Sequence, residues 1–200
     1  MVKIGKDQIQ ELRDRTGLGM MDCRKALEET NGDMDKAIEI LRKKGASVAA
    51  KRADKTTSEG IVHAYIHPGS RLGVMVEINC ETDFVAKTDA VLQLAKDLCM
   101  HIAALKPLYV APGDVPDTFL EKEKSILKEQ MMLSGKPAAM IDQIVEGKVN
   151  KLYGEICLLK QQFVKNDQQT VQDALNEVIA KTGENVVIRR FSRFELGIAL

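Results

Sequence analysis

The sequence predicts an α+β protein, because two short runs with the alternation of a strand lie among longer runs with the period of a helix. Residues 60–67 and 72–79 show the period-two alternation of strands, and Pro68-Gly69-Ser70 between them indicates a β-hairpin. A third strand-like run covers residues 185–196. Strands and helices do not alternate regularly along the chain. We therefore expect a three-stranded antiparallel sheet with flanking helices.

Composition limits the kind of protein and its partners. The chain has 200 residues, and 44% of them are hydrophobic, which is enough for a sizeable core. Lys+Arg and Asp+Glu are both 29, so the net charge is +0, and we expect no direct nucleic-acid partner held by phosphate neutralisation. Neither a signal peptide nor a membrane span is expected from the apolar runs, and these observations together predict a cytoplasmic protein.

Cysteine and histidine spacing does not predict a metal site or a cofactor. The cysteines are widely spaced and none forms Cys-x-x-Cys, so reduced, mostly buried thiols are expected at Cys23, Cys80, Cys99 and Cys157. His63 and His67 would share one face of a strand, but roughly 13 Å would separate their Cα atoms, which is too far for one zinc ion.

Three short helices with tight turns are expected in residues 1–45. The first covers residues 6–15 with Gly17 as its C-cap, and the second covers residues 19–30. Asp33 can cap the third, which is expected to end at Gly45. About forty residues is near the lower limit for an independent core, so this unit should bind a partner or lean on a neighbouring domain.

The turn at residues 16–21 is more apolar than a connection requires. Met20 and Met21 are adjacent, so they point in different directions on a helix and cannot both enter one small core. We expect one of them to be exposed as an adaptable contact surface. The alternative, which the sequence supports equally well, is that the following domain covers both methionines.

An Ala-rich, basic stretch at residues 46–57 is expected to be a helical linker to a core domain at residues 58–200. In that domain, Thr88 or Asp89 should begin a helix that reaches Leu105. Two further helices within about 116–156, divided by Gly135-Lys136-Pro137, should form a helical hairpin with charged outer faces. Residues 161–165 are expected to return irregularly to the core.

The last helix is expected to start at Thr170, because Asp173 follows at the spacing of a capping box, and to stop at Gly183. No arrangement of nucleophile, base and carboxylate stands out along the chain. Gly17-x-Gly19 lacks the third glycine and the preceding strand of a nucleotide loop. The residues alone therefore favour a binding protein over an enzyme.

The segment at residues 79–89 connects the predicted hairpin to the helix after it. It places one Phe84 behind the polar lead Glu81-Thr82-Asp83, in a chain with only 4% aromatic residues. On local pattern the favoured interpretation is a hydrophobic staple at the start of the next helix. The alternative is a side chain held out to contact a partner, since loops on rigid scaffolds often carry function.

Two long motifs resemble the signatures of the translation elongation factor Ts family. Residues 12–27 resemble its N-terminal signature, and residues 79–86, Asn-Cys-Glu-Thr-Asp-Phe-Val-Ala, resemble the second. Shorter matches agree in order and spacing at residues 101–104 with Pro107, and at 134–137, 145–148 and 162–164. The resemblance covers essentially the whole chain.

The resemblance implies a guanine-nucleotide exchange factor that binds elongation factor Tu in its GDP-bound and nucleotide-free forms. It implies no catalytic residue, and a loop that disturbs the magnesium and nucleotide site of Tu. Asp83 and Phe84 match the intruding pair, with Thr82 and Val85 flanking them. Phe84 is then expected to be exposed, which reverses the staple interpretation.

The same resemblance implies that the first helices form a ubiquitin-associated-like module that contacts the G domain of Tu. Arg13, Met20 and Met21 match its contact positions, and His101 matches a histidine near the intruding Phe in longer family members. On local pattern alone, the favoured interpretation of His101 is a structural histidine near the end of its helix, with its hydrogen bonds satisfied. This chain has one hairpin unit only, and the short form of the family compensates as a homodimer, which we expect here. The alternative function is a non-exchanging adaptor whose N-terminal module docks a peptide or an RNA-associated partner.

Overall fold

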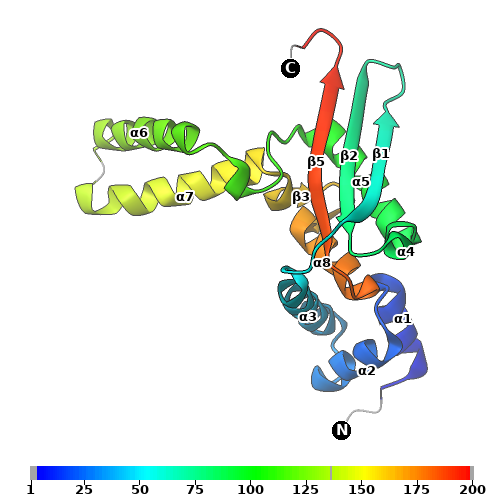
Figure 1. Cartoon of the computed structure of the whole chain (residues 1–200). Coiled ribbons are helices and arrows are strands. Elements are labelled where there is room, and N and C mark those ends of the chain that lie inside the picture. The colour runs from blue at the N-terminus through cyan, green and yellow to red at the C-terminus, as the bar shows by residue number, and fades with distance from the viewer. Residues whose placement is uncertain (1–3, 136, 199–200) are drawn as a thin grey trace.

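The computed structural model of the chain describes residues 4–135 and 137–198, and a three-stranded sheet lies at its centre (Figure 1). The strands β1 (Glu59–Ile66), β2 (Leu72–Cys80) and β5 (Val186–Glu195) pair in the order β1-β2-β5, and both pairs are antiparallel. The predicted α+β class and its antiparallel sheet are confirmed. Lys136 of the predicted turn and the extreme ends of the predicted ranges, 1–3 and 199–200, lie outside the described residues.

The main core lies between the sheet and two helices, α5 (Asp89–Leu105) and α8 (Val171–Thr182). Alternate residues of a strand point to opposite faces, so Val74, Val76 and Ile78 of β2 enter this core. Met75 lies on the other face and is 48% exposed. The sheet therefore has one face covered by helices and one face in contact with solvent, on which apolar side chains such as Met75 lie beside the Arg190–Glu77 ion pair.

The first three helices pack around a separate hydrophobic cluster. They are α1 (Lys6–Thr16), α2 (Met20–Glu29) and α3 (Met34–Arg52), and we call them the N-terminal module. Two predicted caps are confirmed: Gly17 has the left-handed φ of 64° after α1, and the Asp33 side chain accepts from the Lys36 N–H at the start of α3. The buried cluster comprises Leu12, Leu18, Cys23, Ala26, Leu27, Ala37 and Leu41.

The prediction that the third helix ends at Gly45 was wrong, since α3 continues to Arg52. A Cβ added to Gly45 would lie 3.5 Å from the Asn176 carbonyl oxygen and 3.7 Å from Ala180 Cβ, both on α8. Gly45 therefore allows two helices to approach closely rather than ending one. Much of the predicted linker, residues 46–52, is the last part of α3.

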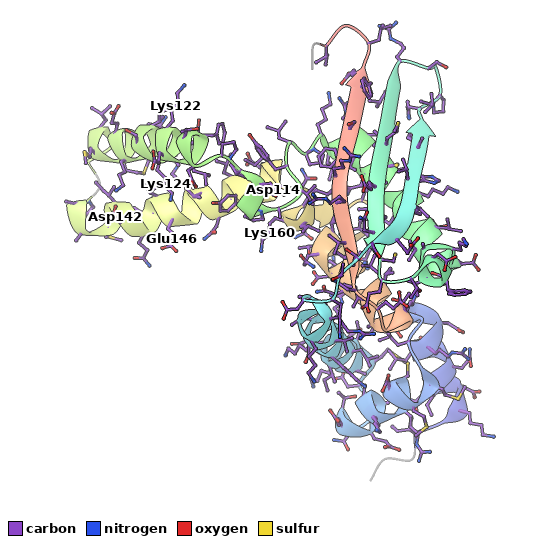
Figure 2. All side chains as sticks on the ribbon, viewed as in Figure 1. Asp114, Lys122, Lys124, Asp142, Glu146 and Lys160 are labelled. Carbon is purple, nitrogen blue, oxygen red and sulfur yellow. The ribbon has the colours of Figure 1, made fainter. Side chains whose placement is uncertain are left out.

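Two antiparallel helices form an arm that projects from the core (Figure 1). They are α6 (Asp117–Leu133) and α7 (Ala138–Ile156), so the predicted helical hairpin is confirmed. Its small core is formed by Ile141, Val145 and Val149 of α7 against residues of α6. Figure 2 shows Lys122 and Glu146 on the outer sides of the arm, which agrees with the predicted charged faces.

The return from the arm is more regular than predicted. After the 3-10 turn η2 (Leu158–Lys160), β3 (Gln162–Phe163) and β4 (Asn166–Thr170) form a small two-stranded sheet where an irregular segment was expected. Another 3-10 turn, η1 (Pro112–Asp114), precedes the arm. The predicted capping box is confirmed, because the Thr170 hydroxyl accepts from the Asp173 N–H and the Asp173 carboxylate accepts from the Thr170 N–H.

The cysteine thiols are free and buried at all four positions, as predicted. Burial raises the pKa of Cys80 and of Cys99 to about 11, so both remain protonated at neutral pH. Among the described residues, no helix is both long and apolar enough to cross a membrane.

Candidate partner-binding site

The short helix α4 (Asp83–Ala86) begins directly after β2 and presents Phe84 to solvent. Phe84 is 81% exposed, whereas the next two residues turn inward: Val85 packs against the main core and Ala86 is buried. The staple interpretation is therefore wrong, and the expectation of an exposed Phe84 is confirmed. The ring lies on a single helical turn rather than on an extended loop.

The exposed Phe84 ring could form a favourable apolar contact with another molecule. Covering such a side chain stabilises a complex by roughly 1.5–3 kcal/mol. Because the backbone on both sides of Phe84 is folded, little ordering of the chain would offset that gain. The geometry therefore suits insertion of the ring into an apolar space of another molecule.

Asp83 places a negative charge beside this ring. Its carboxylate accepts from the Lys87 ammonium at 2.7 Å, across one turn, and the Asp83 side chain is about half exposed. This hydrogen bond lowers the pKa of Asp83 and raises that of Lys87, so both are ionised at neutral pH. A partner that approaches α4 meets an apolar ring next to a carboxylate.

Thr82 caps α4 with its side-chain oxygen, which accepts from the Val85 N–H at 3.4 Å. The Thr82 N–H and hydroxyl in turn donate to the two carboxylate oxygens of Glu184, at 3.0 and 2.9 Å. The sequence analysis missed Glu184. Its position just after the predicted end of the last helix gave no local signal, because the contact joins segments 102 residues apart.

The residues of the N-terminal module that were expected to contact a partner all lie at the surface. Arg13 is exposed on α1, and Met20 and Met21 at the start of α2 are 51% and 62% exposed. We expected one exposed methionine, but both are exposed, and the following domain does not cover them. Leu18 and Cys23 fill the small core instead. Two flexible apolar side chains therefore remain available to a partner.

His101 is not available in the same way. It is fully buried, its Nε2 lies 2.9 Å from Gln161 Oε1, and its Nδ1 accepts from the Val164 N–H at 3.2 Å. Burial lowers the pKa of His101, so the ring is neutral at pH 7. The expected partner contact is therefore corrected: the side chain connects α5 to the β3–β4 segment.

The length of α5 also separates His101 from Phe84. His101 lies in the last turns of this helix, whereas Phe84 precedes its start, and a helix rises about 1.5 Å per residue. Within one chain, His101 cannot lie beside Phe84. In the described part of the chain, no group of three or more His, Cys, Asp or Glu side chains is arranged to hold a metal ion.

Comparison with known proteins agrees with the motifs. A family model described as "Elongation factor TS" matches residues 20–198. Relatives named elongation factor Ts include that of Thermoanaerobacter sp. strain X514, 57% identical over 194 residues, covering 97% of this chain and 95% of the relative. The relative from Carboxydothermus hydrogenoformans is 58% identical, with coverage of 98% and 91%. That from Herpetosiphon aurantiacus is 52% identical, with coverage of 98% and 99%.

Proposed function

The chain belongs to the elongation factor Ts family of translation elongation factors, and from this we propose that it is a guanine-nucleotide exchange factor for elongation factor Tu. It binds Tu–GDP, disturbs the magnesium and nucleotide site, and promotes the release of GDP. The observation that carries this proposal is the exposed Phe84 on a folded turn beside an ionised Asp83. Since translation elongation takes place in the cytoplasm, we expect the protein to act there.

The mechanism follows from reciprocal binding. A protein that binds nucleotide-free Tu more tightly than Tu–GDP weakens GDP binding by the same factor. Each tenfold of weakening requires about 1.4 kcal/mol of contact energy that exists only in the nucleotide-free state. A ring that is covered only when elements of the partner part satisfies this requirement. Displacement of magnesium would also remove the charge that compensates the GDP phosphates.

We assign the N-terminal module to docking and α4 to the disturbance of the nucleotide site. Arg13, Met20 and Met21 offer a cationic and apolar surface that is separate from α4. Thr82 and Val85 support the turn from either side of Asp83 and Phe84. In this scheme the protein makes and breaks no covalent bond, so it is not an enzyme in the usual sense.

The test is Phe84→Ala in a stopped-flow assay of fluorescent GDP release from Tu. Because Phe84 is 81% exposed, the variant should fold with nearly unchanged stability, within about 0.5 kcal/mol. Release stimulated by this variant should fall by about tenfold or more, corresponding to a lost contact of about 1.4 kcal/mol. Leu133→Ala is the matched control, because Leu133 is an 89% exposed apolar residue at the end of α6.

Wild-type exchange by Phe84→Ala would remove the ring from the mechanism. A wild-type protein that binds Tu but does not accelerate release would instead support the adaptor alternative. Co-purification with Tu adds a second test, because excess GDP should dissociate an exchange complex and leave an adaptor complex intact.

We also propose that the protein is a homodimer through the open face of the sheet. Val62 and Ile66 of β1, Met75 of β2 and Phe194 of β5 all lie exposed on that face. Two such faces can pack as a sandwich about 10 Å apart. The family resemblance supports a second copy of this chain as the occupant, since a chain with one hairpin unit would act as a pair.

A further inference from the structure

A group of polar side chains joins the start of α4 to two segments that are distant in sequence. Glu184 accepts from the N–H and hydroxyl of Thr82, as described above. Glu81 accepts from the Asn185 N–H at 2.6 Å and lies 3.5 Å from Arg52 Nε. We call these five residues the turn clamp.

The turn clamp connects the end of α3, the end of α8 and the start of α4. Arg52 at the end of α3 donates through Nε to the carbonyl oxygen of Gly183, the C-cap of α8, at 2.7 Å. Asn185 is buried, and its side-chain amide donates to the carbonyl oxygens of Ala53 and Lys55 at 3.3 and 3.0 Å. The turn that carries Phe84 is therefore connected to the end of the N-terminal module and to the α8–β5 connection.

Glu184 affects α4 by orienting the hydroxyl group of Thr82. The Thr82 hydroxyl has one proton, and it donates that proton to Glu184 Oε1. Its lone pairs are then directed so that one accepts from the Val85 N–H and caps the turn. Glu184 thus sets the direction of the hydroxyl that starts the helix containing Phe84.

Helix α4 requires such anchors because it has only four residues. A helix this short is not stable by itself, since the first turn costs more conformational entropy than its hydrogen bonds return. Ala86, which is buried in the main core, holds one end of the turn. Glu184 holds the other end through Thr82, and Phe84 lies between the two anchors.

We propose that Glu184 is a positioning residue for nucleotide exchange: it fixes Thr82 so that the Phe84 ring projects in the orientation that enters the partner. The rate readout rests on the proposed function, whereas the position of the ring can be measured in the free protein. Without Glu184 the turn must be ordered when the partner binds, and that cost opposes insertion of the ring. We expect the maximal rate of stimulated GDP release in Glu184→Ala to fall by about tenfold, equivalent to about 1.4 kcal/mol.

The chain contains a matched control for a general loss of stability. At the start of α8, the N–H and hydroxyl of Thr170 both donate to one carboxylate oxygen of Asp173, at 2.9 and 2.7 Å. Asp173→Ala removes the same kind of threonine–carboxylate contact from a helix that does not carry Phe84. Its unfolding midpoint should fall at least as much as that of Glu184→Ala, while its maximal exchange rate should stay within about twofold of wild type.

A spectroscopic measurement tests the position of the ring directly. The chain has no Trp, so Phe84→Trp introduces a single tryptophan at the turn, and its fluorescence can be excited separately from that of the three Tyr residues. Time-resolved anisotropy of this reporter should show a larger fast component in Glu184→Ala and little change in Asp173→Ala. Glu184→Gln keeps one acceptor oxygen, so it should give an intermediate result, and it carries the test if Glu184→Ala does not fold.

Wild-type anisotropy and wild-type exchange in both Glu184 variants would overturn the proposal. So would an equal loss of exchange in Asp173→Ala, because a general loss of stability would then explain both. If the wild-type protein does not accelerate GDP release at all, the proposed exchange function fails. In that case the anisotropy still decides whether Glu184 holds the turn.

Discussion

At the scale of single residues, Phe84 and His101 both match residues of the family motifs, but Phe84 is exposed to solvent and His101 is buried. The exposure of Phe84 was expected only from the family resemblance, because the local pattern favoured a hydrophobic staple. The hydrogen-bond partners of His101 could not be predicted, because Gln161 and Val164 lie about 60 residues further along the chain.

The buried His101 predicts a specific dependence of stability on pH. Burial lowers its pKa in the folded state below the usual value near 6.5, while the Gln161 hydrogen bond opposes that shift. The unfolded chain therefore binds more protons just below pH 6.5, so the free energy of unfolding falls as the pH decreases through this range. The slope should approach, and not exceed, about 1.4 kcal/mol per pH unit for one proton.

Urea unfolding between about pH 5.5 and 7.5 measures this slope. In His101→Asn the slope should flatten, because Asn keeps an acceptor for the Val164 N–H and cannot bind the proton. An unchanged slope in His101→Asn would show that His101 does not cause the pH dependence.

At the scale of elements, the sequence predicted best where the signal was local. The caps at Gly17, Asp33 and Thr170 were identified, and Thr88 was one of two candidates for its cap, because a cap depends on residues within one helical turn. Gly45 was misassigned for the opposite reason. A glycine that ends a helix and a glycine that lets another helix approach look the same in sequence, and here the contact is with α8, far along the chain.

This close approach predicts opposite effects for two substitutions at Gly45. Gly45→Ala should stabilise the protein by about 0.5–1 kcal/mol, because its Cβ meets only ordinary contacts and Ala favours a helix. Gly45→Leu should destabilise it by about 1–3 kcal/mol, because the larger side chain must push α3 and α8 apart. Chemical denaturation measures both changes.

Gly147→Leu in α7 is the control, because a Cβ at Gly147 meets nothing within 4 Å. That variant should be at least as stable as wild type, since Leu is the better helix former. Equal behaviour of the two Leu variants would mean that the α3–α8 contact does not limit residue size at position 45.

At the scale of the whole molecule, one face of the sheet is not covered by any helix of the described chain. The strand pattern predicted two faces, but an alternating pattern gives no information on whether a second layer covers both. In the structure, α5 and α8 cover one face, and Val62, Ile66, Met75 and Phe194 remain exposed on the other. Covering side chains of this size contributes roughly 1.5–3 kcal/mol each, and four from each copy together are comparable with the cost of association.

Met75→Glu tests the proposed dimer, because Met75 lies on the central strand β2, and a carboxylate there would be buried against the second copy. In sedimentation velocity, the wild-type protein should sediment as a dimer and Met75→Glu as a monomer with an unchanged circular dichroism spectrum. Leu133→Glu, with the same new charge on the arm, should remain a dimer. A monomeric wild-type protein across micromolar concentrations would contradict the proposal. If two cores must act together on Tu, the monomeric Met75→Glu variant should also stimulate GDP release less than wild type, even though its Phe84 turn is intact.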